Sequence, residues 1–431
     1  MARTNWAGNV TYRASALARP TSVDELQSLV ASTPRLTALG STHSFNEIAD
    51  TDAVQVTLAD LPQVVEVDTE RRVARVAAGM THAQVAVALE ARGWALANLA
   101  SLPHISTAGA VATGTHGSGV RNPSLAQSVV GLELVRADGS LARVSGSGVG
   151  AGSVVGADVG AVAGAELDAH RVALGALGVV TTVELAIEPS FQVATTVHTG
   201  LGWDVVDEHF ETVMSAGYSV SMFTGYTDEG VRQVWTKRRT DRDEPVFDLQ
   251  AVGAVAGTAP IHPVPGSDVA GVTDQQGVPG PWHERLPHFR SAFTPSAGEE
   301  IQAEWLVPAE AAVPAIQALR TIGDQLAPVL FVSEIRRIAA DQAWLAPSSE
   351  RDSVAFHFTF HRDPGAVVSL LPVIEDVLAP FDPRPHWGKV SAASPDRLHL
   401  AYPRLAAFAA LAREVDPGGR FRNPFLERVL G

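Results

Sequence analysis

Alternating and clustered apolar residues predict short strands and helices over the first 190 residues. The apolar run Leu36–Leu39 predicts a buried strand. Capping boxes that begin at Ser22 and Thr81 precede apolar positions at helical spacing, so each predicts a helix. The alternation around an Asp-Gly pair predicts a hairpin over 129–144. Further strands are predicted over 54–58, 64–67, 73–76 and 179–187.

Beyond residue 190, several strands with a period of two carry polar side chains on one face and apolar ones on the other. In Phe356–His361, the phenylalanines share one face. The polar faces of these strands carry Gln302, Glu304, Glu334, Arg336, His357, Thr359 and His361. The pattern favours a sheet with a helical layer on one face and a polar cleft on the other. A solvent-exposed face with chance ion pairs is the alternative interpretation.

Other segments of the second half complete this picture. Stretches rich in alanine and leucine predict helices over about 309–326, 366–378 and 402–414. The proline-rich segment 262–295 predicts a long loop over a binding surface. A turn is predicted over 416–425, close to the end of the chain.

A polar turn directly after the first apolar strand is the central candidate for chemistry. Gly40 lets the backbone turn tightly, and Ser41, Thr42, His43 and Ser44 follow. Such a turn can present amide groups and hydroxyls to an anion, and it adds an imidazole. A polar loop with a surface histidine is the alternative for this stretch taken alone.

A second glycine-rich stretch, 101–119, places small residues beside threonine, serine and histidine, so that a ligand can approach the backbone closely. It lacks the G-x-G-x-x-G spacing that opens a helix after a strand. It also lacks the lysine of a phosphate-binding loop. These differences disfavour a nicotinamide-binding Rossmann domain and a P-loop.

Length and composition set broad limits. The 431 residues suffice for two or three domains, and 46% apolar with 18% charged residues indicates a globular protein with an ample core. A net charge of −15 argues against nucleic acid or an anionic membrane as partner. The basic cluster Lys237–Arg239 is followed by acidic residues, and we predict a solvated loop there.

The sequence contains no cysteine, which excludes disulfides, thiol nucleophiles and thiolate metal sites, and we expect no metal site. The N-terminal residues lack the apolar region of a signal peptide. The tract Gly146–Ala165 is too rich in glycine, and too polar at Asp158, for a membrane span. We therefore expect a cytoplasmic protein, with a loop over this tract to which we assign no role.

Segments spread in order over nearly the whole chain match known proteins. They are Leu39–Ser44, Ala100–Ser106, Ala112–Gly119, Gly175–Gly178, Gly280–His288, Glu334–Arg336, His386–Lys389 and Phe421–Pro424. Together they resemble the covalent flavoprotein oxidases of the vanillyl-alcohol-oxidase type. The bacterial alditol oxidase branch is the most similar, and the aldonolactone oxidases also resemble the chain.

The resemblance implies an α+β fold of two domains. Residues 1–189 would form a PCMH-type FAD-binding domain. Residues 190–400 would form a cap domain that has an antiparallel sheet with flanking helices and binds the substrate. Residues 401–431 would return to the FAD-binding domain. The change of composition near Ser190 agrees with this division.

The resemblance also implies FAD as the cofactor, joined covalently to His43, whose neutral imidazole is a competent nucleophile. Ser41, Thr42 and Ser44 would lie by the pyrophosphate, although the family more often has glycine at the position of Thr42. The other implied FAD contacts are Leu39, Gly40, Ser106, Gly109, Thr113, Gly114, His116, Gly117, Ser118, Gly178, Val179, His386 and Asn423.

For the substrate, the resemblance implies a catalytic set of Ser101, Glu334, Arg336 and Lys389, with His357 and Thr359 behind them. The implied activity is oxidation of the terminal hydroxyl of a polyol, such as xylitol or sorbitol, to the aldose. Dioxygen would be reduced to hydrogen peroxide. A polyol offers only hydroxyls, so its site needs convergent donors and acceptors, and these residue types supply both. We expect a monomer whose partners are the polyol and dioxygen.

Two alternatives remain at this point. An aldonolactone oxidase or dehydrogenase of the gulono- or galactonolactone type would use the same fold and flavin. A flavin-free carbohydrate-binding or scaffold protein, in which the glycines only form turns, belongs to a different functional class.

Overall fold

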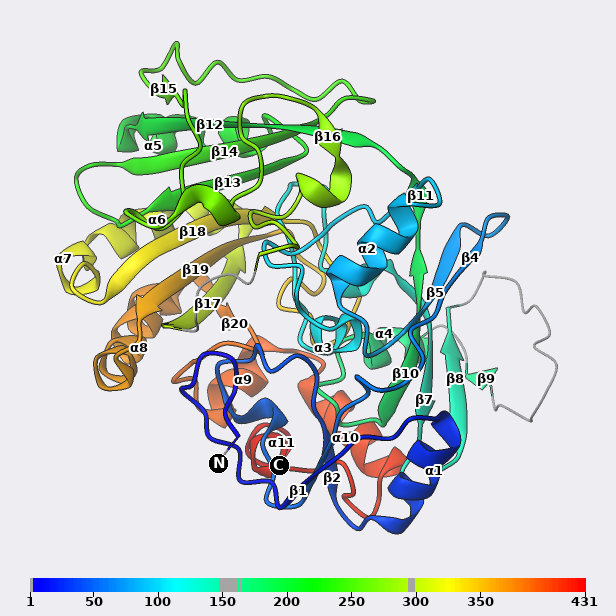
Figure 1. Cartoon of the computed structure of the whole chain (residues 1–431). Helices are drawn as coiled ribbons and strands as arrows, with labels where there is room; N and C mark the ends of the chain where they lie inside the picture. Colours follow the sequence, from blue (N-terminus) through cyan, green and yellow to red (C-terminus); the bar gives the residue numbers. More distant parts are fainter. Residues whose placement is uncertain (1–2, 147–160, 163–164, 294–298) are drawn as a thin grey trace.

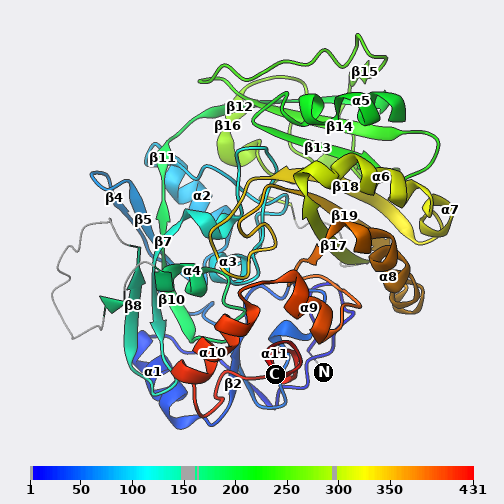
Figure 2. The ribbon, with the colours of Figure 1, turned by 180° about the vertical axis from the view of Figure 1, so that it is seen from behind.

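The computed structural model describes residues 3–146, 161–162, 165–293 and 299–431, arranged as two parts that face each other (Figures 1 and 2). The tract Gly146–Ala165, where we predicted a loop, lies almost wholly outside the described residues.

The first part is built from three sheets and several helices. The small parallel sheet has the order β1 (Ala16–Ala18), β3 (Val54–Val56), β2 (Leu36–Ala38). The larger sheet has the order β4 (Val65–Asp68), β5 (Val73–Ala77), β10 (Val179–Ala186), β7 (Val129–Val135), β8 (Leu141–Ser145), β9 (Ala161–Val162). A short ribbon pairs β6 (Trp94–Ala95) with β11 (Glu188–Pro189). The predicted strands of this half are thereby confirmed.

Both predicted capping boxes lie at helix starts. The side chain of Ser22 accepts from the Glu25 amide at the start of α1 (Val23–Ser32). At α2 (His82–Glu90), Thr81 and Gln84 accept from each other's backbone amides. These bonds satisfy N–H groups that a helix start leaves without partners, which is why the pattern predicted the boundaries. The helices α3 (Thr107–Ala112) and α4 (Ala165–Arg171) complete this part.

The second part is a large antiparallel sheet covered on one face by helices (Figure 1). Its order is β15 (Val255–Ala256), β12 (Gln192–Leu201), β14 (Val231–Arg239), β13 (Ser219–Thr224), β18 (Leu330–Ile338), β19 (Ser353–His361), β17 (Glu300–Pro308), β20 (Arg384–Pro385), with β16 (Gly280–Pro281) beside β12. The helices are α5 (Trp203–Met214), α6 (Ala312–Arg320), α7 (Gly323–Leu326) and α8 (Pro364–Leu378).

The alternation along these strands separates core from cleft as predicted. Phe356, Phe358 and Phe360 belong to the core that also contains apolar residues of α5, α6 and α8. The polar residues between them face away from the helices, since side chains alternate along a strand. By length and composition alone, Pro364–Phe381 could span a membrane. Its residues Val367, Leu371 and Ile374, however, pack into this core.

The prediction of a solvated loop at Lys237–Arg239 is wrong. These residues end β14, which lies between β12 and β13, and both Lys237 and Arg239 are buried. Arg239 forms ion pairs of 2.8 Å with Glu188 and with Asp241. A buried charge is tolerated when hydrogen-bond or ion-pair partners satisfy it. The partners of Lys237 come from a loop far along the chain, so the sequence around Lys237 does not predict them.

The C-terminal segment contains α9 (Pro395–Ala401), α10 (Leu405–Val415) and α11 (Pro424–Leu430). The predicted turn ends earlier than expected, because Asn423 caps α11 by accepting from the Leu426 amide. Phe408 and Leu426 belong to the same core as β7 and β10, while the second core draws on residues from Leu201 to Leu378. The division into 1–189, 190–400 and 401–431 stays a prediction.

Candidate active site

A cavity of about 900 Å³ runs from the glycine-rich turns of the first part to the polar face of the large sheet. The predicted loop over 262–295 borders it, since His262, Asp268, His288 and Phe293 are among its lining residues. A cavity of this size falls in the range of small-molecule and cofactor sites.

The two glycine-rich stretches lie against each other at one end of the cavity. The Ser106 amide donates to the Ser41 hydroxyl (3.0 Å), and the Ser41 amide donates to the Ser106 hydroxyl (3.3 Å). A Cβ atom added at Gly40 or at Gly109 would lie 2.5 or 2.7 Å from Ser106 Oγ, which is too close. Glycine at both positions therefore permits this contact and leaves an open backbone cradle.

Thr42 has a left-handed backbone conformation, with φ of 63°. Its carbonyl accepts from the Trp6 amide at 2.9 Å. A β-branched residue is strained at this φ, whereas glycine is not. The turn geometry thus accounts for a preference for glycine at this position.

His43 lies on the cavity wall with its ring against the indole of Trp6; the centroids are 5.2 Å apart and the planes 22° apart. Its Nδ1 atom is buried and has no hydrogen-bond partner among the described residues. Burial lowers the pKa of His43 to about 4. The imidazole is therefore neutral near pH 7, which a nucleophilic histidine requires.

Most predicted cofactor residues line this cavity. Those that do are Leu39, Gly40, Ser41, Thr42, His43, Ser44, Ser106, Gly109, Thr113, His116, Gly178, Val179 and His386.

Four predicted cofactor residues do not line it, and each has another contact. The side chain of Asn423 donates to the Ile48 and Asp50 carbonyls, and that of Ser118 donates to the Val220 carbonyl. At Gly117, a Cβ would meet the side chain of Asn98 and the carbonyl of Leu99, and at Gly114 it would meet Pro347. These positions shape the walls behind the cavity.

At the other end of the cavity, strand pairing assembles a row of polar residues. His357 on β19 lies opposite Glu304 on β17 and opposite Glu334 on β18. Arg336, two residues beyond Glu334, lies between the two carboxylates. It pairs with Glu304, and its Nε lies 3.6 Å from Glu334 Oε2. Ser101 Oγ lies 3.5 Å from Arg336 Nη1.

These charges hold one another in the ionised state. Burial acts to raise the pKa of Glu334, but Arg336 and His288 outweigh it, and the pKa stays well below its usual range. For Glu304, burial is likewise outweighed by Arg336 and His116, and its pKa is also low. Burial acts to lower the pKa of Arg336, yet the two carboxylates raise it. The Glu–Arg–Glu group therefore keeps one net negative charge and faces the cavity.

Lys389 supplies a second cation. Its Nζ donates to Gln302 Oε1 and lies 3.4 Å from His357 Nε2. Burial lowers the pKa of Lys389 to about 8, so the ammonium form prevails at neutral pH. Thr359 completes this wall of the cavity. The structure thus brings all the predicted catalytic residues, Ser101, Glu334, Arg336 and Lys389, to one end of the cavity.

Sequence reasoning missed several residues of this site. His288 Nε2 lies 2.8 Å from Glu334 Oε1, and Lys237 Nζ lies 3.0 Å from Nδ1 of the same ring. Gln302 and Glu304 were placed on a polar face but not in the site. The alternation along their strand could have placed Gln302 and Glu304 in the site. No local sequence pattern predicts that Lys237 is buried.

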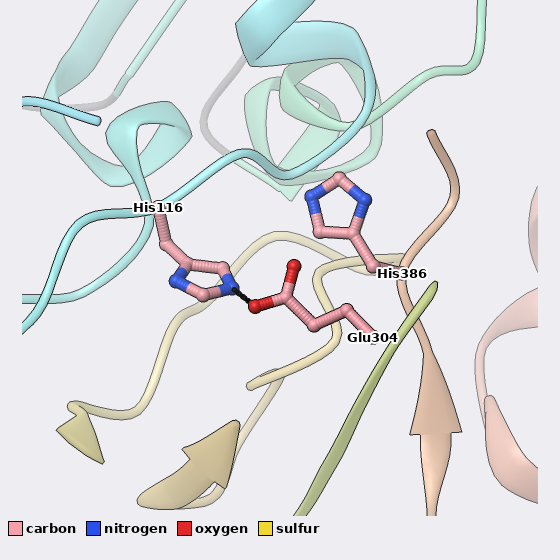
Figure 3. Close-up of side chains that lie close together, drawn as sticks. All are labelled: His116, Glu304 and His386. Atoms are coloured by element: carbon pink, nitrogen blue, oxygen red, sulfur yellow. Dashed lines mark ion pairs between the residues drawn. The ribbon is translucent and has the colours of Figure 1, made fainter. Parts of the chain in front are cut away.

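His116, Glu304 and His386 form a compact group whose ligand-type atoms lie within 4.8 Å of one another (Figure 3). His116 Nδ1 donates to the Gly117 carbonyl (3.0 Å), and its Nε2 lies 3.4 Å from Glu304 Oε1. The same carboxylate oxygen pairs with Arg336. We interpret the group as part of the charge network, because the carboxylate already pairs with Arg336. The absence of a metal site stays a prediction.

Comparison with known proteins identifies the chain. A family model described as an FAD binding domain matches residues 14–145, and one described as D-arabinono-1,4-lactone oxidase matches 297–429. Alditol oxidase from Streptomyces sp. (strain IKD472 / FERM P-14339) is 49% identical over 99% of this chain and 98% of its own length. L-gulonolactone oxidase from Bos taurus is 26% identical over 99% of this chain and 97% of its own.

Among solved structures, cholesterol oxidase from B. sterolicum has a TM-score of 0.77 at 12% identity, covering 100% of this chain and 96% of its own. This likeness shows the fold. Fold and cavity together define an FAD-dependent oxidoreductase that acts on CH–OH donors. The chain belongs to the alditol oxidase family of vanillyl-alcohol-oxidase-type flavoproteins. The α+β fold class and the expected cofactor, FAD, are thereby confirmed.

The residues present fit FAD. The glycine cradle at Gly40 and Gly109 leaves backbone open to a pyrophosphate, and within the described ranges the buried Nδ1 of His43 has no hydrogen-bond partner. The cavity continues from there to the Glu–Arg–Glu group, so a bound flavin ring and a substrate would share one space.

Proposed function

We propose that this protein oxidises the terminal hydroxyl of an alditol such as xylitol or sorbitol to the aldose, with reduction of dioxygen to hydrogen peroxide. The observation that carries the proposal is the buried Glu334–Arg336 pair, which lines one cavity together with Lys389. The 49% identity to an alditol oxidase over nearly the full chain supports it.

The side chains match the chemistry of a polyol. Glu334 is ionised and accepts hydrogen bonds from hydroxyls, while Arg336 and Lys389 donate. Cations beside the reacting hydroxyl favour loss of its proton, and Glu334 orients the chain and balances the charge. Bound FAD supplies the acceptor for the hydride of the carbinol carbon and passes the electrons to dioxygen.

We further propose that His43 carries the flavin covalently and that Ser41, Thr42 and Ser44 lie by the pyrophosphate. The neutral imidazole, whose Nδ1 has no hydrogen-bond partner among the described residues, supports the first assignment, and the interlocked turn at Ser41 and Ser106 supports the second. We also propose that the protein acts as a cytoplasmic monomer, with the polyol and dioxygen as its partners.

An aldonolactone oxidase or dehydrogenase is the second candidate. The match of residues 297–429 to a family described as D-arabinono-1,4-lactone oxidase favours it, because β17, β18 and β19 lie in that range. The lactone-oxidising relatives, however, are about half as similar as the alditol oxidase, at 24–27% over the full chain against 49%.

An oxygen-electrode assay tests the proposal. Xylitol and sorbitol are expected to drive oxygen uptake with formation of hydrogen peroxide, and L-gulono-1,4-lactone is expected to be a poor substrate. Turnover of the lactone but of neither polyol would favour the second candidate. Reduction of a dye without oxygen uptake would identify a dehydrogenase. Flavin fluorescence that stays on the chain in a denaturing gel, and is lost in His43→Ala, tests the attachment and would exclude a flavin-free binding protein.

A further inference from the structure

The N-terminal segment folds back over the turn that carries His43. Asn5 Nδ2 donates to the Ser44 carbonyl (2.9 Å), and Asn9 Nδ2 donates to the Phe45 carbonyl (2.8 Å). The backbone amide of Trp6 donates to the Thr42 carbonyl at 2.9 Å. Carbonyl groups on both sides of His43 are therefore bound by one short segment.

We call these three hydrogen bonds from Asn5, Trp6 and Asn9 the clamp. Within it, the indole of Trp6 covers one face of the His43 ring. The centroids lie 5.2 Å apart with planes 22° apart. The ring of Phe45 is nearly perpendicular to the indole, with 6.3 Å between their centroids. Both Trp6 and His43 line the cavity. Stacked rings resist rotation about the terminal side-chain torsion, which is otherwise broad for histidine. The stack thus fixes the plane in which the imidazole nitrogens point.

We propose that Trp6 is a positioning residue for the covalent bond between His43 and the flavin. This inference rests on the attachment proposed above. In the net reaction, a C–N bond forms between an imidazole nitrogen and the 8α-methyl carbon, and one N–H and one C–H bond break. Two protons and two electrons are released and pass to dioxygen, which becomes hydrogen peroxide. Dioxygen is the oxidant that the enzyme already uses.

The stack acts on this reaction in two ways. A nucleophile reacts fastest when its lone pair is held in line with the carbon, so a fixed ring plane lowers the entropic cost of attack. The indole also excludes water from one face of the imidazole, which keeps the ring in the neutral, nucleophilic form. Neither effect requires Trp6 to touch the substrate.

The test measures the rate at which flavin becomes covalently attached to the chain, not the rate of substrate oxidation. The full chain is synthesised in a cell-free system with FAD present, and samples are taken over time. Flavin fluorescence on the chain in a denaturing gel is divided by the amount of chain. Trp6→Phe keeps an aromatic face and is expected to attach flavin at close to the wild-type rate. Trp6→Leu removes it and is expected to attach about two- to tenfold more slowly.

A control separates stacking from simple anchoring of the segment. Asn9→Ala removes the hydrogen bond to the Phe45 carbonyl and the one that Asn9 accepts from Asn5 (2.7 Å), but it leaves the Trp6 ring, so its attachment rate is expected to stay near wild type. If Trp6→Leu yields no folded chain, Trp6→Met fills similar space without a ring and carries the same expectation. Attachment by a folded Leu or Met variant as fast as by Trp6→Phe would overturn the inference.

The two proposals fail in different ways. A wild-type chain that never carries flavin on a denaturing gel, or a His43→Ala variant that does, contradicts the attachment at His43. The role of Trp6 fails alone if wild type is labelled, His43→Ala is not, and loss of the aromatic ring at position 6 changes nothing.

Discussion

The Nε2 atom of His288 lies 2.8 Å from Glu334 Oε1, deep in the wall of the cavity. Lys237 donates to the Nδ1 atom of the same ring from the far side (3.0 Å). Burial lowers the pKa of Lys237 to about 7. Below that pH the side chain is an ammonium with only donors, so Nδ1 accepts and Nε2 carries the proton. The histidine is thereby held as a donor to Glu334, which directs the other carboxylate oxygen toward Arg336.

This contact predicts a loss of substrate affinity when the donor is removed. In the double variant Lys237→Met/His288→Leu, both buried partners are replaced by apolar groups, so no charge is left unpaired. A hydrogen bond to a charged group contributes about 1.5–3 kcal/mol. We expect kcat/KM for xylitol to fall about 10- to 100-fold, mainly through KM. In the matched variant Lys237→Met/His288→Gln, the amide still donates to Glu334 and should retain most activity; equal losses in both would contradict the role of His288.

Arg336→Lys tests the bridge between Glu304 and Glu334. A lysine keeps the charge but cannot reach two carboxylates with the geometry of a guanidinium. We expect kcat/KM for xylitol to fall about 100-fold. The neighbouring Arg337 pairs instead with Glu211 (3.3 Å) on the other face of the strand. Arg337→Lys should therefore change steady-state kinetics by no more than about twofold.

Thr42→Gly is expected to stabilise the protein. A left-handed φ costs a residue with a side chain about 1–2 kcal/mol, and the greater flexibility of unfolded glycine offsets part of the gain. We expect the free energy of unfolding to rise by about 0.5–1 kcal/mol in urea titrations. Thr33, whose φ of −96° carries no such strain, provides the control. Thr33→Gly should lower stability, and a loss of stability in both variants would show that the turn is not strained.

Stability should fall as the pH drops below about 6.5. Burial lowers the pKa of His288 to about 4 and that of His357 and His386 to about 3. An unfolded histidine titrates near 6.5, so between these values the unfolded chain binds more protons and gains stability as the pH falls. Each group contributes up to about 1.4 kcal/mol per pH unit in this window. Urea unfolding at a series of pH values measures the slope, and His288→Gln should reduce it; a flat profile between pH 6.5 and 4 would contradict the expectation.

Local patterns predicted the elements because their causes are local. The capping residues at Ser22 and Thr81 satisfy amides within the same turn, and the alternation in Phe356–His361 follows from the pleat of one strand. The resemblance carried by short segments led to FAD and to Ser101, Glu334, Arg336 and Lys389 before any geometry was known. The structure brings these four predicted residues to the wall of one cavity.

Contacts between distant segments decided the rest. Glu304 and Glu334 flank Arg336 only because β17 and β18 both pair with β19. Lys237 is buried because a loop 49 and 51 residues farther along supplies Leu286 and His288.

The sequence by itself determined the turn at Gly40, the histidine that follows it and the polar faces of the strands, since each depends on neighbours along the chain. Only the tertiary structure decided that Thr42 takes a left-handed φ, that Trp6 covers His43 and that the charges compensate in a buried row. The physical reason is that burial and charge pairing depend on which surfaces meet in three dimensions.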